Sequence, residues 1–147
     1  MKLTDVEKTD TMLETLALMS AECFKGIEQP PPGDFARMFR KGDVFTKDGG
    51  SGRVVAYAIM ERQHVGLYLW QIAVSPNYRD RGIGSQLLDD MYGYYARHHH
   101  QVIELNVMID NTVAQMLYLK NGYKVVSVMR GLYGPHVDGL RMRRNIP

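Results

Sequence analysis

The sequence predicts a single domain over residues 1–147, of the mixed α/β (α+β) class, with a mixed and mostly antiparallel sheet flanked by helices. A chain of 147 residues is long enough for one domain that buries a sizeable core. Its 45% hydrophobic content is ordinary for a globular protein. Apolar residues alternate in some segments and recur at helical spacing in others, which predicts the element order βααβββαβαββ.

Charge, cysteine and histidine content argue against several functional classes. A formal charge of +2 is too small to indicate a nucleic-acid partner or a membrane surface. The segment Met1–Asp5 lacks the apolar core of a signal peptide, and no apolar run reaches membrane-spanning length. Cys23 is the only cysteine, so we expect no internal disulfide and a reducing, cytoplasmic location. The run His98–His100 cannot turn three side chains to one ion in regular structure, and no metal site is expected.

The first forty residues predict a short strand and two helices. The strand is expected over Leu3–Val6. Asp10 is the expected N-cap of the first helix, because apolar residues at helical spacing follow it. The proline-rich segment Gln29–Gly33 ends that helix. A second, shorter helix is expected over Asp34–Arg40, capped by Asp34.

Three strands are predicted next. Val44–Lys47 and Arg53–Glu61 flank Asp48–Gly52, a segment typical of a hairpin turn. A second turn at His64–Gly66 leads into a strand over Leu67–Val74. The apolar run in that strand is long enough for a buried strand and too short for most helices.

The stretch after this strand has the features of a phosphate-binding loop. Ser75–Asn77 stops the strand, because Pro lacks a ladder donor and Asn favours turns. Arg79–Gly84 carries two glycines, and an amphipathic helix is expected over Gly82–Arg97. Free N–H groups at a helix start bind anions, and glycines let the backbone approach them. A dinucleotide fingerprint does not fit, because Leu87 holds its third glycine position, and the Gly-Lys-Ser/Thr of a P-loop is absent.

The remainder of the chain predicts a strand, a helix and a last pair of strands. Gln101–Ile109 alternates apolar and polar residues, as a half-buried strand does. Asp110–Thr112 is expected to cap a helix that Asn121–Gly122 ends. The final strands are expected over Tyr123–Met129 and Gly139–Arg144.

Two spaced motifs resemble those of a known family. The first, Arg-x-x-Gly-x-Gly, lies at Arg79–Gly84 between the predicted strand and helix. The second is Asn111-x-x-Ala114-x-x-Leu117-Tyr118-x-x-Asn121-Gly122-Tyr123, with Tyr123 where the family usually has Phe. Both resemble the motifs of the GNAT family of N-acetyltransferases, and they occur in that family's order. The resemblance is strong over Leu67–Tyr123 and rests on element order elsewhere.

The resemblance implies a binding site for acetyl-CoA and no metal. The backbone groups of Ile72, Ala73 and Val74 would pair with the pantetheine arm like an added strand. Asn111 would contact the cofactor, although a plain N-cap explains this residue equally well. The pyrophosphate would be wrapped, mainly by backbone N–H groups, by Arg79, Asp80, Arg81, Gly82, Ile83, Gly84 and Ser85.

The resemblance also implies direct attack of a neutral amine on the thioester, without a covalent enzyme intermediate. Tyr118 would donate a proton as CoA leaves as a thiolate, since a phenol is protonated at neutral pH. Packing on the sheet is the other explanation of this tyrosine. The N–H of Ile72 or a neighbour would polarise the thioester carbonyl. Cys23 lies outside both motifs, so nothing nominates it as a nucleophile.

The expected catalytic base departs from the family pattern. Many relatives carry Glu or His at positions that here look like Tyr68 and Asn106, and Glu61 and Glu104 are the nearest carboxylates in sequence. Roughly a tenth of an α-amino group is neutral at pH 7, against well under about a thousandth of a lysine amine. A site that relies on Tyr68 and ordered water therefore suits the less basic amine, with Glu61 as a candidate substrate contact.

The end of the chain bears on the acceptor. Leu132-Tyr133, followed by Asp138–Arg144, resembles the tail of acetyltransferases that act on protein N-termini, where a tyrosine before the last strand helps hold the peptide. A peptide α-amine is therefore the expected acceptor. A small-molecule amine, such as a polyamine or an aminoglycoside, stays open, and an acidic pocket built from Glu61, Glu104 and Asp138 would favour it. A non-catalytic module that senses acyl-CoA and a homodimeric assembly also stay open.

Overall fold

In the computed structural model, which describes residues 6–147, one mixed sheet of six strands has the order β1-β2-β3-β4-β6-β5. Only β3 and β4 run parallel, and every other neighbouring pair is antiparallel. The elements are α1 (Asp10–Cys23), η1 (Gly26–Glu28, a 3-10 turn), α2 (Pro32–Lys41), β1 (Asp43–Asp48), β2 (Val54–Gln63), β3 (Gly66–Val74), η2 (Pro76–Tyr78, a 3-10 turn), α3 (Ile83–Arg97), β4 (Val102–Met108), α4 (Thr112–Lys120), β5 (Lys124–Met129) and β6 (Gly139–Asn145).

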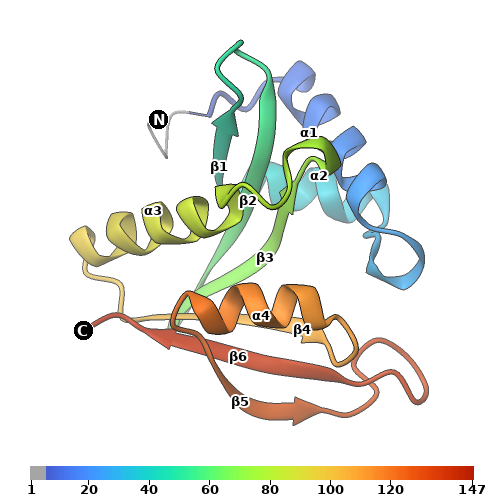
Figure 1. Cartoon of the computed structure of the whole chain (residues 1–147), viewed down its shortest axis with the longest axis vertical. Coiled ribbons are helices and arrows are strands. Elements are labelled where there is room, and N and C mark those ends of the chain that lie inside the picture. Colours follow the sequence, from blue (N-terminus) through green and yellow to red (C-terminus); the bar gives the residue numbers. More distant parts are fainter. Residues whose placement is uncertain (1–5) are drawn as a thin grey trace.

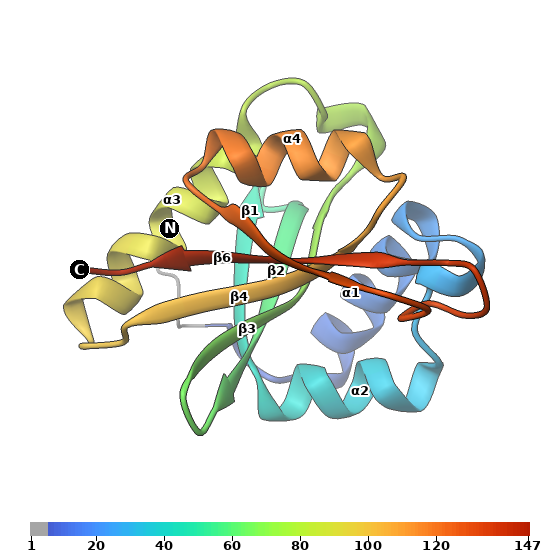
Figure 2. The ribbon, with the colours of Figure 1, turned by 90° about the horizontal axis from the view of Figure 1, so that it is seen from below.

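The helices cover both faces of the sheet. Helices α1 and α2 lie against one face, and α3 and α4 lie against the other (Figures 1 and 2). Each face has its own core: Leu87, Met91 and Tyr118 pack on the α3 and α4 side, whereas Leu16 and Phe39 pack on the α1 and α2 side. The predicted fold class is therefore confirmed.

Several element boundaries differ from the prediction. The predicted strand over Leu3–Val6 falls on residues 1–5, which lie outside the described residues, and on Val6, which is not in a strand. Thr9, not Asp10, caps α1, because its hydroxyl accepts a hydrogen bond from the Met12 N–H at 3.0 Å. Asp10 instead lies in the first turn, where the helix dipole favours a carboxylate.

Helix α2 and strand β4 were also displaced from their predicted bounds. Helix α2 begins at Pro32 rather than at its predicted cap Asp34, because proline's fixed φ suits the first helical position. Strand β4 ends at Met108, one residue short of the prediction, and Ile109 is 45% exposed. The Asn111 N–H donates to the Met108 carbonyl at 3.0 Å, which turns the chain toward α4.

A bulge in β3 turns its side chains over midway. In the pairing with β2, Met60 lies opposite Leu69 and Ile59 opposite Gln71, so Trp70 has no partner. Leu69 packs in the core under α3, whereas Trp70 packs on the α1 and α2 side. A bulge bends a strand and increases its twist. Its position here coincides with the end of pairing between β3 and β4.

The parallel pairing of β3 with β4 is short. It joins only Leu67–Leu69 to Ile103–Leu105, after which the two strands diverge. The half of β3 that follows the bulge, Gln71–Val74, pairs with β2 on one side and with no described strand on the other. This divergence leaves an open strand edge in the middle of the sheet.

No helix among residues 6–147 is long and apolar enough to cross a membrane.

Candidate active site

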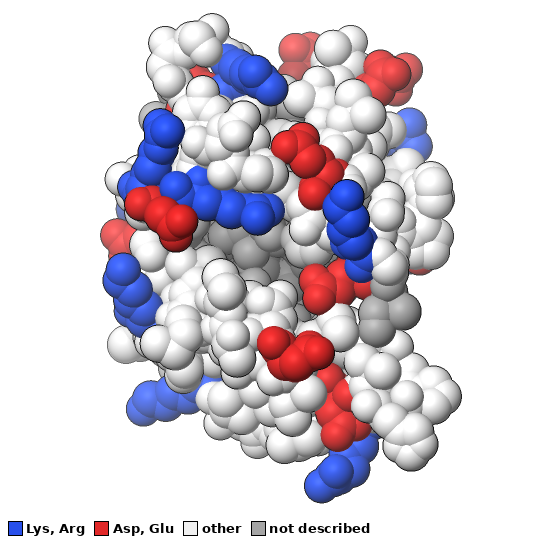
Figure 3. Space-filling view, turned by 45° about the vertical axis from the view of Figure 1, so that its right-hand side comes forward, with Lys and Arg blue, Asp and Glu red and all other residues white. Residues whose placement is uncertain are grey.

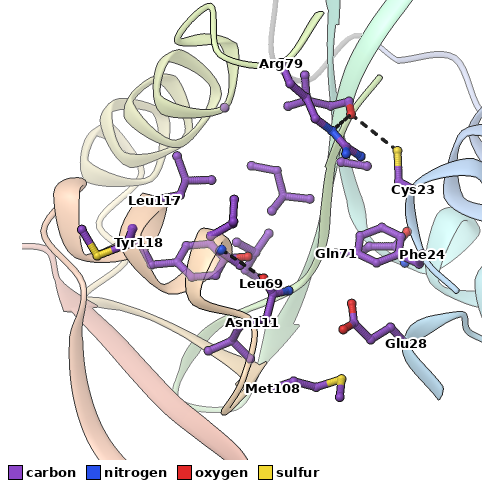
Figure 4. Close-up of a pocket in the computed structure, with 18 of the residues that line it drawn as sticks. Cys23, Phe24, Glu28, Leu69, Gln71, Arg79, Met108, Asn111, Leu117 and Tyr118 are labelled. Carbon is purple, nitrogen blue, oxygen red and sulfur yellow. Dashed lines mark hydrogen bonds between the residues drawn. The ribbon is translucent and has the colours of Figure 1, made fainter. Parts of the chain in front are cut away.

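A cleft of about 1180 Å³ opens where β3 and β4 diverge. Its walls come from β3, the turn after it, the start of α3, helix α4, the end of β4, the β5–β6 connection and the connection between α1 and α2 (Figure 4). Ligand pockets usually measure about 300–1,000 Å³, so the cleft can hold an extended molecule together with an acceptor.

The start of α3 forms one end of the cleft. Gly82 stands at the N-cap position with φ +76° and offers no side chain to cap the helix. The N–H groups of the first turn are therefore free for an anion. Asp80 also adopts a left-handed conformation, with φ +61°, so the backbone curls around this end. Gly82, Ile83, Gly84 and Ser85 all line the cleft.

The polar side chains at this end are held by protein contacts. The Arg79 Nε donates to the Val74 carbonyl at 3.1 Å, and Ser85 Oγ accepts from Asn121 Nδ2 at 3.0 Å, which ties α3 to α4. Arg81 lies over the Tyr78 ring at 5.0 Å and is not among the lining residues. Of the predicted pyrophosphate set, the structure thus brings all but Arg81 to the cleft.

The open edge of β3 forms the middle of the cleft. Ile72, Ala73 and Val74 line it, as predicted for residues that would pair with an extended ligand. The Val74 carbonyl already accepts from Arg79 and, at 3.5 Å, from the Cys23 thiol. Cys23, the last residue of α1, also lines the cleft, and burial raises the pKa of its thiol.

Helix α4 brings Asn111 and Tyr118 to the opposite wall. Asn111 caps the helix, because its Oδ1 accepts from the Ala114 N–H at 3.1 Å (Figure 4). Tyr118 is 8% exposed and packs edge-on to Tyr123 at 5.8 Å, yet it also lines the cleft. Burial raises the pKa of Tyr118, which keeps its hydroxyl protonated. The packing explanation of this tyrosine is therefore confirmed, and its place in the cleft leaves the proton-donor role a prediction.

Two further phenols stand at the other end of the cleft. Tyr68 on β3 and Tyr133 in the β5–β6 connection both line it. Burial raises the pKa of Tyr133 to about 12 and also raises the pKa of Tyr68. Asn106 lies beside Tyr68 and accepts from Arg141 Nε at 3.1 Å, and the Arg141 charge partly offsets the shift of Tyr68.

The carboxylates that the sequence suggested for an acidic pocket lie elsewhere. Glu104 accepts two hydrogen bonds from Arg143, at 2.6 and 2.9 Å. Asp138 accepts from the Gly131 N–H at 2.8 Å. Glu61 pairs with Tyr68 across β2 and β3, but neither Glu61 nor the other two acids is among the lining residues.

Glu28 is the carboxylate that the sequence analysis missed at this end. It is the last residue of η1, lines the cleft and points its carboxylate into it (Figure 4). The available signal was its place directly before the Gln29–Gly33 segment, within the connection between the first two helices. That signal could not show which way the side chain points.

The described residues contain no set of side chains arranged to bind a metal ion. Among residues 6–147, no group of three or more His, Cys, Asp and Glu side chains is placed to hold a metal ion. His98 instead stacks on Tyr94 at 4.2 Å, near the end of α3. Over the face shown in Figure 3, basic and acidic side chains alternate rather than form a patch of one sign.

Comparison with known proteins gives one family. The sequence pattern of the acetyltransferase (GNAT) family matches residues 13–123. The N-alpha-acetyltransferase RimI of Mycobacterium tuberculosis is 30% identical over 135 residues, which cover 88% of this chain and 84% of that protein. The [Ribosomal protein bS18]-alanine N-acetyltransferase of Escherichia coli is 29% identical over 89 residues, and the match covers 60% of each chain.

Solved structures share the fold. The ribosomal-protein-alanine N-acetyltransferase of Escherichia coli superposes with a TM-score of 0.85 at 21% identity, covering 99% of this chain and 93% of that one. An aminoglycoside 6'-N-acetyltransferase complexed with coenzyme A gives a TM-score of 0.79 at 15% identity, covering 99% and 96%. At these identities the likeness concerns the fold and does not distinguish the acceptors.

Proposed function

Since this chain belongs to the acetyltransferase (GNAT) family, we propose that it transfers the acetyl group of acetyl-CoA to a primary amine, with the α-amine of a peptide as acceptor. The observation that carries this proposal is the cleft between β3 and β4. An uncapped helix start, an open strand edge and a cluster of phenols all line this one cleft. These three parts fit the phosphate, the extended arm and the reacting end of acetyl-CoA, in that order.

The residues at the first two parts would hold acetyl-CoA without a metal. Backbone N–H groups of Ile83, Gly84 and Ser85 would bind the pyrophosphate, helped by the α3 dipole. The free edge of Ile72 and Ala73 would pair with the pantetheine arm. When bound, acetyl-CoA supplies an activated thioester.

At the reacting end, the chain's own groups stabilise charge and move protons. The Ile72 N–H, or a neighbouring one on the open edge, would hydrogen-bond the thioester oxygen as negative charge develops there. Tyr118, protonated and inside the cleft, would give its proton to the leaving sulfur. General acids of this kind contribute about 10²- to 10⁴-fold to rate.

A peptide α-amine fits the acceptor end better than a polyamine does. Both similar sequences carry names of enzymes that acetylate an α-amine or an alanine of a ribosomal protein. Tyr133, in the β5–β6 connection, and Glu28, in η1, both line the cleft, and a peptide would pass between them. A polycation would require several carboxylates. None of the three expected acids lines the cleft, and Glu28 is the one described carboxylate that lines its acceptor end.

Release of CoA thiol with a panel of amines tests the proposed function. The panel contains an alanine-initiated tetrapeptide, the same peptide with a blocked N-terminus and an internal lysine, spermidine, and an aminoglycoside. We expect turnover with the free α-amine to exceed that with the others at neutral pH. Binding of acetyl-CoA without turnover of any amine would instead identify a non-catalytic acyl-CoA sensor. The cytoplasmic location and the homodimer stay predictions.

A further inference from the structure

Glu28 stands apart from the other carboxylates near the cleft because nothing described in the protein engages it. Its side chain is half-buried and points into the cleft (Figure 4). Among residues 6–147, no cation or hydrogen-bond donor acts on its carboxylate, whose pKa is raised by burial and, to a smaller extent, by the charge of Asp110. Glu104, by contrast, is fully engaged by Arg143. A half-buried carboxylate without a partner is suited to a cationic ligand.

The groups around Glu28 come from four other elements. The Glu28 charge contributes to the raised pKa of both Tyr118 on α4 and Tyr133 in the β5–β6 connection, so all three lie within electrostatic reach of one another. Tyr68 on β3 also contributes to the raised pKa of Tyr118 and of Tyr133. Asp110 is the other acid whose charge acts on Glu28, and the guanidinium of Arg141 lies by Tyr68 and Asn106. The cluster thus carries two carboxylates and neutral phenols, with its one guanidinium turned to Asn106.

We propose that Glu28 is a catalytic residue that holds the acceptor's ammonium group and takes one proton from it before attack. This inference rests on the proposed acetyl transfer, and it deepens that proposal by naming the base. The position opposite Tyr118 lets the amine enter between the carboxylate and the reacting end of the cleft. Tyr68 and Tyr133 would then act as hydrogen-bond partners that orient the amine.

The protons balance with Glu28 and Tyr118 alone. Glu28 takes one proton from the ammonium group, and the neutral nitrogen forms a bond to the thioester carbon. The carbon–sulfur bond breaks as Tyr118 gives its proton to sulfur, and the second nitrogen proton returns to the Tyr118 oxygen. The product amide and CoA thiol leave, and Glu28 releases its proton to water. The net change is one proton set free for each ammonium acetylated.

The pH dependence of Glu28→Gln separates proton transfer from mere positioning. The assay measures kcat/KM for the alanine-initiated tetrapeptide from about pH 6 to about pH 9.5, with acetyl-CoA saturating. In the variant only the neutral amine reacts, so the rate should rise about tenfold per pH unit until the amine's pKa of about 8. We expect a loss of about 10²-fold near pH 6.5 that shrinks at least about tenfold by pH 9.

Two variants serve as controls. Glu22→Gln makes the same charge change on an exposed residue of α1 that does not line the cleft, and should leave the whole profile unchanged. For the natural chain we expect kcat/KM to be nearly independent of pH below about pH 8, because Glu28 accepts the proton of the ammonium group. Glu28→Asp keeps a carboxylate and should show the same pH dependence at a reduced rate. The affinity for acetyl-CoA, measured by calorimetry, should be the same in all variants.

Three outcomes would overturn the assignment. A loss in Glu28→Gln that is equal at every pH, or one that falls on KM alone, would make Glu28 a positioning residue. An unchanged profile would give Glu28 no part in the reaction. If the natural chain itself turns over no amine, the proposed function fails, and that result is distinguishable because it does not depend on the variants.

Discussion

The two ends of the cleft are assembled from the chain in different ways. At the cofactor end, most lining residues come from one segment of the chain, Ile72–Ser85, and the groups proposed to bind are mostly backbone atoms. At the acceptor end, Glu28, Tyr68 and Tyr133 come from segments far apart in the sequence and present side chains to the cleft. In the proposed function, a local motif therefore binds the cofactor, whereas acceptor binding depends on how distant segments pack together.

The bulge at Trp70 links the two ends. It turns Trp70 and Gln71 to the α1 and α2 side, where the buried Tyr57 hydroxyl donates to the Gln71 side chain. It also coincides with the point at which β4 separates from β3. The open strand edge and Tyr68, which both line the cleft, therefore lie on either side of this distortion.

If the ends are separable, substitutions should affect either acetyl-CoA binding or acceptor turnover, and not both. Tyr118 stands at their junction and is expected to show the largest effect. In Tyr118→Phe, kcat should fall by about 10²-fold or more, because the proton donor is lost while the ring keeps its packing against Tyr123. Steady-state kinetics of CoA thiol release gives kcat, and calorimetry should show an unchanged Kd for acetyl-CoA. Unchanged turnover with a competent amine would remove Tyr118 from the proton path.

The cofactor end is tested by a matched pair of glycines. Gly82 and Gly52 both have positive φ, and a Cβ at either would meet no protein atom within 4 Å. Alanine at either position should cost about 1–2 kcal/mol of folding free energy, because the left-handed conformation disfavours a side chain. Only Gly82→Ala should also weaken acetyl-CoA binding, by about tenfold in Kd, since only Gly82 lines the cleft. Equal Kd values for the two variants would mean that the start of α3 does not bind the pyrophosphate.

A smaller effect is expected at the acceptor end from Tyr133→Phe. With its pKa raised to about 12, the Tyr133 hydroxyl stays protonated at neutral pH and can donate to a peptide carbonyl. Loss of one such bond costs about 1 kcal/mol, so KM for the tetrapeptide should rise about fivefold with kcat and the acetyl-CoA Kd unchanged. A change in the Kd for acetyl-CoA would show that the two ends are not separable.

The contrast also explains what could be predicted from the sequence. The order of elements from the first helix onward, the hairpin, the Gly82 turn and the Asn111 cap follow from local patterns, and each is present in the structure. The Thr9 cap was missed because Thr9 and Asp10 are both good caps and differ by one residue. Such errors shift a boundary without moving the site.

The acceptor end was harder to predict because its residues do not form a motif with a fixed spacing in the sequence. Glu28 lies directly before the proline-rich segment Gln29–Gly33, but only the packing of η1 in the folded chain turns its carboxylate into the cleft. Glu104 and Asp138 are acids of the same kind, and their partners, Arg143 and the Gly131 N–H, lie in segments that the sequence could not bring together. Side-chain direction in a connection is a tertiary property, which local pattern does not determine.

Mass spectrometry of a single doubly reactive peptide tests the central claim most directly. An alanine-initiated peptide with a free N-terminus and one internal lysine is incubated with the chain and acetyl-CoA at about pH 7. The account predicts one acetyl group, on the α-amine, because this amine is less basic than a lysine side chain and gives up its proton more readily: roughly a tenth of it is already neutral at pH 7. Acetylation of the lysine side chain in preference to the α-amine would contradict it.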